Sequence, residues 1–269
     1  MKKWIYGLTS LFTLSVTAAE LPLYYWDARQ THGFSNFGDA ISEQIIERIV
    51  GHPLRVTSDP FISEQKLVGI GSIINYAQDG DVIWGSGINF KYRNPSSYRF
   101  QQVDVRAVRG PLSREFLMKM GVACPEVYGD PTLLLPRLFP EFQKSENPSR
   151  DYIVIPHFSD EHSYANDPHL VSVKESWDTV VKAILDSQFV ISSALSGVIV
   201  AEAYGIPARL LRVSENEDLL KYVDYYHGTK RFEFKYATTV DEALQMGGEP
   251  MPECDLDKLL RSFPFDYFN

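Results

Sequence analysis

Two kinds of hydrophobic segment alternate along this chain. Short runs rich in β-branched residues predict strands, and apolar residues that recur every three or four positions predict helices. The strands expected in the first half are 21–26, 67–70, 82–84, 103–108 and a short one before Gly129, with helices that follow Asn36 and Pro111 and end at Gly51 and Gly121. The second half predicts strands at 152–155, 170–173, 189–193 and 208–213, and helices at 177–185, 198–204 and 255–260. Such alternation is typical of βαβ units and parallel sheets, so the predicted fold class is α/β.

A polar segment separates the two halves. Residues 141–151, EFQKSENPSRD, have no apolar periodicity and contain a proline, as expected of a linker. The sequence therefore predicts two α/β domains of similar size, 20–145 and 146–269. Small-molecule sites tend to form in the cleft between two such domains, where we expect facing strand ends.

Charge argues against one class of partner. The 269 residues include 35 acidic and 26 basic side chains, for a formal charge of −9. Such a chain repels a phosphate backbone, so nucleic acid is not an expected partner.

The N-terminus has the pattern of a secretory signal peptide. Lys2 and Lys3 precede an apolar run from Trp4 to Val16, and small residues follow before Glu20. We expect residues 1–19 to direct export. The run is short for a transmembrane helix, so a membrane is expected as a partner only through an uncleaved N-terminus, and cytoplasmic use of an uncleaved chain is the alternative.

Cysteine chemistry is not expected to define the fold. Cys124 and Cys254 are the only two cysteines, too few for a disulfide framework or a thiolate metal cluster. We expect no metal site and interpret both as core thiols.

Glycines follow two of the expected strands. Gly71-Ser72 comes after the strand at 67–70, and Gly85-Ser86-Gly87 after that at 82–84. Turns of this kind let a ligand approach the backbone, which makes Ser72 and Ser86 candidate pocket residues, although glycines after strands commonly form tight turns without a ligand.

An anion site is indicated between 103 and 131. Arg109 stands at the carboxyl end of one strand and beside a helix N-terminus, and Asp130 follows the end of the next strand. Open α/β sheets bind ligands at these strand ends, and a guanidinium beside backbone donors suits a phosphate or carboxylate. A surface arginine that caps a loop is the alternative interpretation.

Taken together, the motifs resemble those of the polysaccharide pyruvyl transferase family. They are NFGD (36–39), GIGS (69–72), GSGI (85–88), VRGPLSR (108–114), YGDPTLLLP (128–136), IPH (155–157), SSALSGVIVAEAYGIPA (192–208) and KYVDYY (221–226). The ordered set is far more specific than any one motif. The resemblance implies two Rossmann-like domains similar to GT-B glycosyltransferases, with phosphoenolpyruvate as donor substrate, a glycan diol as acceptor and no further cofactor.

The donor carries a carboxylate and a phosphate, so its site needs cationic and backbone donors. Arg109 matches the anion-binding arginine of the family, and Arg114 and Lys221 are further candidates. Asp39 and Asp130 are candidates to bind sugar hydroxyls or orient a base. Asp39 as a helix cap and Asp130 as a turn residue are the alternatives.

Ketal formation also needs a general acid. The histidine that the family places on a strand-to-helix turn corresponds here to Ser196, and a serine hydroxyl does not deliver a proton near neutral pH. His157 and His227 are the candidate replacements. Loss of transfer activity in an exported carbohydrate-binding relative is one alternative. A GT-B glycosyltransferase that uses Arg209 and Arg212 for a nucleotide sugar is another.

Overall fold

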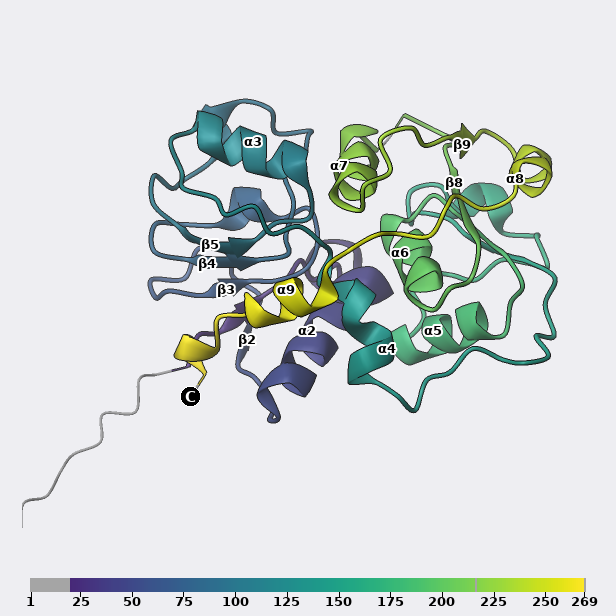
Figure 1. The fold of residues 1–269 in the computed structure, drawn as a ribbon, viewed down its shortest axis with the longest axis horizontal. Coiled ribbons are helices and arrows are strands. Elements are labelled where there is room, and N and C mark those ends of the chain that lie inside the picture. Colours follow the sequence, from purple (N-terminus) through teal and green to yellow (C-terminus); the bar gives the residue numbers. More distant parts are fainter. Residues whose placement is uncertain (1–19, 216, 269) are drawn as a thin grey trace, which may run out of the picture.

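The computed structural model describes residues 20–215 and 217–268, so the predicted signal peptide at 1–19 lies outside the described residues. Two parallel sheets organise this part of the chain, each flanked by helices (Figure 1). The first sheet has the order β2-β1-β3-β4-β5, formed by Val56–Thr57, Leu23–Tyr24, Leu67–Val68, Val82–Trp84 and Asp104–Ala107. The predicted α/β class with parallel sheets is confirmed.

Helices cover both faces of the first sheet. Alternate strand residues point to opposite faces, so Leu23 and Leu67 pack with α2 (Phe37–Val50), whereas Ile83 and Val105 pack with α3 (Pro111–Lys119). Short helical segments lie between these elements: α1 (Arg29–His32), η1 (Ile74–Tyr76) and η2 (Pro95–Ser97). The strand order reverses between β1 and β3, and a ligand crevice is expected at such a switch point.

The second sheet has the order β6-β7-β8-β9, formed by Ile153–Ile155, Val190–Ser192, Ala208–Leu211 and Tyr236–Ala237. Its helices are α5 (Trp177–Leu185), α6 (Leu195–Ala203), α7 (Leu220–Gly228) and α8 (Val240–Met246), and η4 (Glu161–Tyr164) lies after β6. The apolar positions Val180, Val181 and Ile184 of α5 are fully buried, as the helical period predicts.

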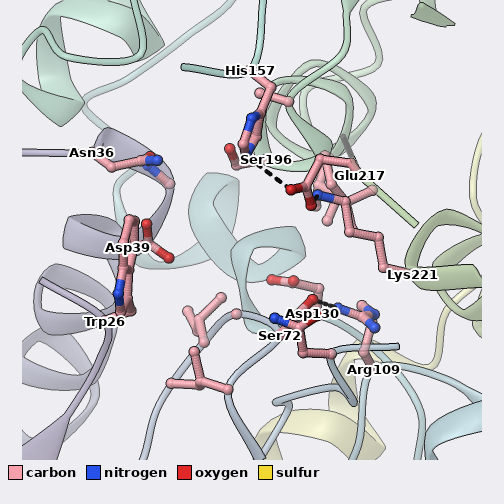
Figure 2. A pocket seen from close by; sticks show the side chains of 18 of the residues that line it. Trp26, Asn36, Asp39, Ser72, Arg109, Asp130, His157, Ser196, Glu217 and Lys221 are labelled. Carbon is pink, nitrogen blue, oxygen red and sulfur yellow. Dashed lines mark hydrogen bonds and ion pairs between the residues drawn. The ribbon is translucent and has the colours of Figure 1, made fainter. Parts of the chain in front are cut away.

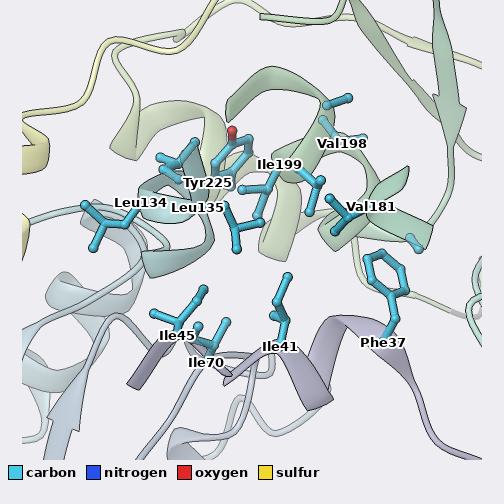
Figure 3. Packing of buried hydrophobic residues seen from close by; sticks show 14 of the residues in the cluster. Phe37, Ile41, Ile45, Ile70, Leu134, Leu135, Val181, Val198, Ile199 and Tyr225 are labelled. Atoms are coloured by element: carbon cyan, nitrogen blue, oxygen red, sulfur yellow. The ribbon is translucent and has the colours of Figure 1, made fainter. Parts of the chain in front are cut away.

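One apolar core joins the two sheets. Figure 3 shows Phe37 and Ile41 of α2 facing Val181 and Val198 of the second half, with Leu134 and Leu135 in the same cluster beside Ile199. Leu134 and Leu135 belong to η3 (Pro131–Leu134) and α4 (Leu135–Leu138), which link the halves. The backbone N–H of Phe37 also donates to the carbonyl of Val173 at 2.9 Å. The halves are therefore packed together rather than joined by the linker alone.

The C-terminal segment returns to the first sheet. It contains α9 (Leu256–Arg261) and η5 (Phe265–Tyr267), seen in yellow beside β3 and β4 in Figure 1. The Trp84 indole N–H donates to the carbonyl of Leu259 at 3.1 Å, and the rings of Trp84 and Phe263 meet edge to face at 5.0 Å. The predicted second domain, 146–269, included this segment. Its packing on a distant strand could not be predicted, because no local pattern in the segment specifies that contact.

Several strands are shorter than expected. Leu23–Tyr24 replaces the predicted strand at 21–26. The segment before Gly129 and the one at 170–173 each make a single parallel bridge, through Tyr128 with Val108 and through Leu170 with Val154. Apolar runs at sheet edges thus pack on the core without completing a ladder.

Candidate functional site

A cavity of ≈ 310 Å³ lies where the carboxyl ends of the two sheets face each other (Figure 2). From the first sheet it receives Trp26 after β1, Ser72 after β3 and Arg109 after β5. The second sheet contributes His157 after β6 and Ser196 after β7. This is the placement that parallel strands predict for a ligand site.

Most of the predicted site residues lie around this cavity. Those that line it are Asp39, Ser72, Arg109, Asp130, His157, Ser196 and Lys221. Ser86 and Arg114 do not. Ser86 is buried and donates to the carbonyl of Gly71 at 3.0 Å, whereas the Nε of Arg114 donates to the carbonyl of Cys124 at 3.1 Å. Both side chains hold neighbouring loops together.

Arg109 is buried and connects the two halves. Its Nε lies 3.1 Å from a carboxylate oxygen of Asp224 on α7, its Nη1 donates to the Ser72 hydroxyl at 2.6 Å, and its Nη2 donates to the Ile88 carbonyl at 3.2 Å. The backbone N–H of Ser113 donates to Asp224 as well. The guanidinium therefore faces the cavity and is also part of a buried ion pair.

Lys221 and Glu217 form a charged pair at the cavity wall. The Lys221 ammonium contacts Glu217, which also accepts from the Lys91 ammonium of the first half at 2.5 Å. Burial lowers the pKa of Lys221, and Glu217 opposes this effect. Burial, the largest single effect, would raise the pKa of Glu217, but the charges of Lys221 and His157 and the hydrogen bonds from Lys221 and Lys91 together hold that pKa at about 2. Two cations thus converge here on one permanent anion.

His157 is a neutral imidazole at neutral pH. Burial, and then the charge of Lys221, lower its pKa to about 4. Its Nδ1 lies 2.8 Å from the Ser159 hydroxyl, and its Nε2 lies 3.8 Å from Glu217. An uncharged imidazole can accept a proton, but it does not supply the imidazolium that the general-acid hypothesis requires.

Asp39 has a raised pKa, in contrast to His157. It lies in the first turn of α2 and is half-buried at the cavity, and burial raises its pKa to about 8 although Lys221 opposes the shift. The helix cap is Asn36, whose side chain accepts from the N–H of Gly38 at 3.0 Å. Asp39 is therefore free of the capping role and carries a proton at pH 7.

Asp130 combines burial with a capping role. Its side chain accepts from the N–H of Thr132 at 2.9 Å and so begins η3, as expected for a turn residue before Pro131. Burial raises its pKa. The carboxyl lines the cavity near Arg109 and Ser72, as Figure 2 shows.

Ser196 lies in the first turn of α6 against the first turn of α2. A Cβ atom built on Gly38 would stand 2.3 Å from the Ser196 hydroxyl oxygen. The two helix N-termini approach this closely because one position is a glycine and the other a serine.

Residues that sequence patterns did not single out complete the cavity. They are Lys91 and Glu217 on loops and the aromatic residues Trp26 and Phe158 at strand ends, and Asp224, which is not in the cavity lining, holds Arg109 from behind. Asp224 stands inside the KYVDYY motif, which could have suggested it. Lys91 and Glu217 stand on irregular loops where no period predicts orientation.

The remaining candidates lie elsewhere. His227 is in the last turn of α7, where its ring meets that of Phe232 at 5.4 Å. Arg209 is buried in an ion pair with Glu249, and Arg212 pairs with Glu215 at 3.6 Å. Burial raises the pKa of Cys124 and of Cys254 to about 11, which makes both thiols poor nucleophiles.

The contact behind Arg109 leads to a stability prediction. A Cβ atom on Gly110 would lie 1.8 Å from the backbone oxygen of Asp224, so Gly110→Ala should lower the free energy of unfolding by about 3 kcal/mol, at the upper end of overpacking costs. Gly121→Ala at the other end of α3 meets open space and should cost only about 1–2 kcal/mol, from its positive φ. Urea unfolding measures both. Equal losses would contradict the tight α3–α7 contact.

Residues 20–215 and 217–268 contain neither a candidate membrane-spanning helix nor a candidate metal site. None of their helices is long and apolar enough to cross a membrane. Likewise, among these residues no three His, Cys, Asp or Glu side chains gather in a way that could hold a metal ion.

Comparison with known proteins identifies the family. The family model described as polysaccharide pyruvyl transferase matches residues 36–215, more than half of the chain. The uncharacterized protein L143 of Acanthamoeba polyphaga mimivirus is 25% identical over 248 residues, covering 84% of this chain and 83% of that protein. Succinoglycan biosynthesis protein ExoV of Rhizobium meliloti (strain 1021) is 25% identical over 213 residues, covering 75% of this chain and 63% of ExoV.

A solved structure supports the fold. The crystal structure of an uncharacterized protein from Klebsiella pneumoniae superposes with a TM-score of 0.51 at 11% identity, over 82% of this chain and 94% of that one. The motif resemblance is confirmed by the family match, which spans the NFGD motif, Arg109 and the turn at Ser196. The chain belongs to the polysaccharide pyruvyl transferase family.

Proposed function

We propose that this protein transfers pyruvate from phosphoenolpyruvate to two hydroxyls of a glycan, as a ketal. Family membership supports the reaction class. The observation that carries the proposal is a cavity between two sheets that is lined by the cations Arg109 and Lys221 and by the carboxyl of Asp39, whose pKa burial raises to about 8. The two parallel sheets with facing carboxyl ends fit a GT-B-like arrangement with the site between the domains.

The cationic side of the cavity is the proposed donor site. Arg109, Ser72 and Lys221 converge from β5, β3 and α7, and they present guanidinium, hydroxyl and ammonium donors. The phosphate and carboxylate of phosphoenolpyruvate need such charge-assisted hydrogen bonds. Glu217 is the ion-pair partner of the Lys221 ammonium, so donor binding involves an exchange of partners at this lysine.

Asp39 is the proposed general acid in place of the missing histidine. Its carboxyl protonates the methylene carbon of the donor, and a sugar hydroxyl adds to the resulting oxocarbenium carbon while His157 accepts its proton. The C–O bond to phosphate then breaks, and phosphate leaves with the proton from His157. The second hydroxyl closes the ketal and returns a proton to Asp39, which balances the cycle.

Two alternatives are less well supported. A nucleotide-sugar transferase needs cations for a diphosphate, but Arg209 is buried against Glu249 and lies outside the cavity lining. A carbohydrate-binding relative without activity remains the second candidate, since Ser196 replaces the family histidine and residues 1–19 are expected to direct export. Donor binding separates it from the transferase.

Replacing Lys221 by glutamine should weaken phosphoenolpyruvate binding by about 10–100-fold, the effect of one charge-assisted hydrogen bond. Lys221 is suitable because its ion pair joins only Glu217, which keeps Lys91 as a partner. Lys119→Gln, on the exposed face of α3, is the matched control. Isothermal titration measures the affinity. A wild-type protein that does not bind the donor would exclude the transferase.

A further inference from the structure

Two aromatic rings from opposite sheets form one side of the cavity. Trp26 follows β1 and Phe158 follows β6, and their rings stack with centroids 6.0 Å apart and planes inclined by 26°. Phe34 packs against Phe158 at 5.6 Å and supports it. Trp26 and Phe158 are half-buried, and both line the cavity. The reaction steps proposed above use neither ring.

We propose that Trp26 and Phe158 form the subsite on which a pyranose ring of the acceptor glycan stacks, an inference that rests on the proposed function. A pyranose has an apolar face of C–H groups and a polar rim of hydroxyls. The negative face of an aromatic ring attracts C–H groups and gives them apolar surface to bury. The hydroxyls need neutral hydrogen-bond partners, and the amides of Asn36 and Asn89 line the same cavity.

The position of the rings fits the geometry that transfer requires. The ring of Phe158 lies 4.4 Å from that of His157, the proposed proton acceptor. Trp26 lies beside Asp39 on the other side, whereas Arg109 and Ser72 lie across the cavity, as Figure 2 shows. A sugar stacked on these rings therefore brings its hydroxyls between His157 and Asp39 and leaves the cationic side to the donor.

Charge favours a sugar over a nucleotide at these rings. A nucleobase would stack equally well, but its phosphates need cations close by. Lys174 lies over the ring of Phe34 at 5.1 Å and is paired with Glu161 at 3.0 Å. The formal charge of −9 also disfavours polyanionic ligands away from the donor site. A neutral ring with hydroxyls matches this part of the cavity.

Saturation-transfer NMR tests the subsite with the full protein. The probes are the methyl glycosides of glucose, galactose and mannose, with sorbitol as a polyol that has no ring face and uridine monophosphate as the nucleotide probe. We expect transfer to ring protons on one face of at least one glycoside and none to sorbitol. Phe158→Leu and Trp26→Leu leave an apolar side chain in place but remove the ring face, and each should weaken binding of that glycoside by about tenfold.

A matched control and a second ligand keep the outcomes distinct. Phe232→Leu alters an aromatic side chain that is 67% exposed and outside the cavity lining, so glycoside binding should not change. In all three variants the affinity for phosphoenolpyruvate should stay within about twofold of the wild-type value, because the sugar subsite and the donor site are expected to be independent. Absence of transfer to every glycoside, transfer that survives both ring substitutions, or preference for uridine monophosphate would each overturn the subsite. Glycoside binding without phosphoenolpyruvate binding would support the sugar subsite and exclude the proposed transferase activity.

Discussion

Removing the guanidinium of Arg109 is expected to lower the free energy of unfolding by about 3–5 kcal/mol, the cost of leaving a buried carboxylate without its partner. In Arg109→Met, Asp224 keeps its hydrogen bonds from Ser113 but loses the charge that compensates it across the interface. Donor binding should disappear as well. Loss of binding in an Arg109 variant is therefore interpretable only together with its stability, measured by urea unfolding.

A double-mutant cycle separates the two roles of Arg109. Asp224→Asn removes the carboxylate charge and keeps an oxygen for Ser113, so Arg109→Met/Asp224→Asn should recover part of the stability that Arg109→Met loses, without recovering donor binding. Arg106→Met on the same strand breaks partly exposed pairs with Asp104 and Asp266 and should cost less than about 1 kcal/mol. If Arg109→Met and Arg106→Met cost the same, the buried pair does not stabilise the interface.

Asp39→Asn is expected to reduce the rate of phosphate release with donor and glycan present by about 10²–10⁴-fold, the usual contribution of a general acid. Since burial raises the pKa of Asp39 to about 8, its carboxyl is uncharged at pH 7 and asparagine matches it in shape and charge. Phosphoenolpyruvate affinity should therefore stay nearly unchanged. Asp257→Asn, an exposed carboxylate paired with Arg137, is the control.

The pH dependence provides an independent test of Asp39. Wild-type activity should fall as the pH rises through about 8, where Asp39 loses its proton, and as it falls through about 4, where His157 gains one. Between about pH 4 and 8, Asp39 is protonated in the folded state and ionised in the unfolded chain. The free energy of unfolding should therefore fall as the pH rises through this range. Asp39→Asn should flatten that slope. Unchanged activity or an unchanged alkaline limb would exclude Asp39 as the acid.

Local sequence patterns predicted most of the fold. The apolar period of α2 and α5, Pro111 at the start of α3 and the glycines at helix ends each act within one segment, so their effect is visible in the sequence. The strands expected before Gly129 and at 170–173 make only a single bridge each, because pairing depends on a neighbouring strand that a local pattern does not contain. The return of the C-terminal segment to Trp84 was missed for the same reason.

Part of the candidate site could be predicted, because strand order places carboxyl ends together. Arg109, Asp39 and His157 each follow a recognisable strand end or helix start, and the cavity lies beside all three. The protonation of Asp39 and His157 could not be predicted, since it depends on burial and on Lys221 across the cavity. Glu217 and Lys91 stand on irregular loops, and their pairing became evident only from their distance in space.

The shared core also constrains how substrates enter and leave. Swinging the two sheets apart would break the Phe37–Val173 hydrogen bond and expose Phe37, Ile41 and Val181 to water. Each such side chain costs about 1.5–3 kcal/mol to expose, so a wide hinge motion is too costly to occur on every turnover. Substrate entry and product release should instead depend on movement of the loops that carry Lys91 and Glu217, because the ion pair between these residues can break in solvent. Turnover would then be sensitive to salt and insensitive to changes in the linker at 141–151.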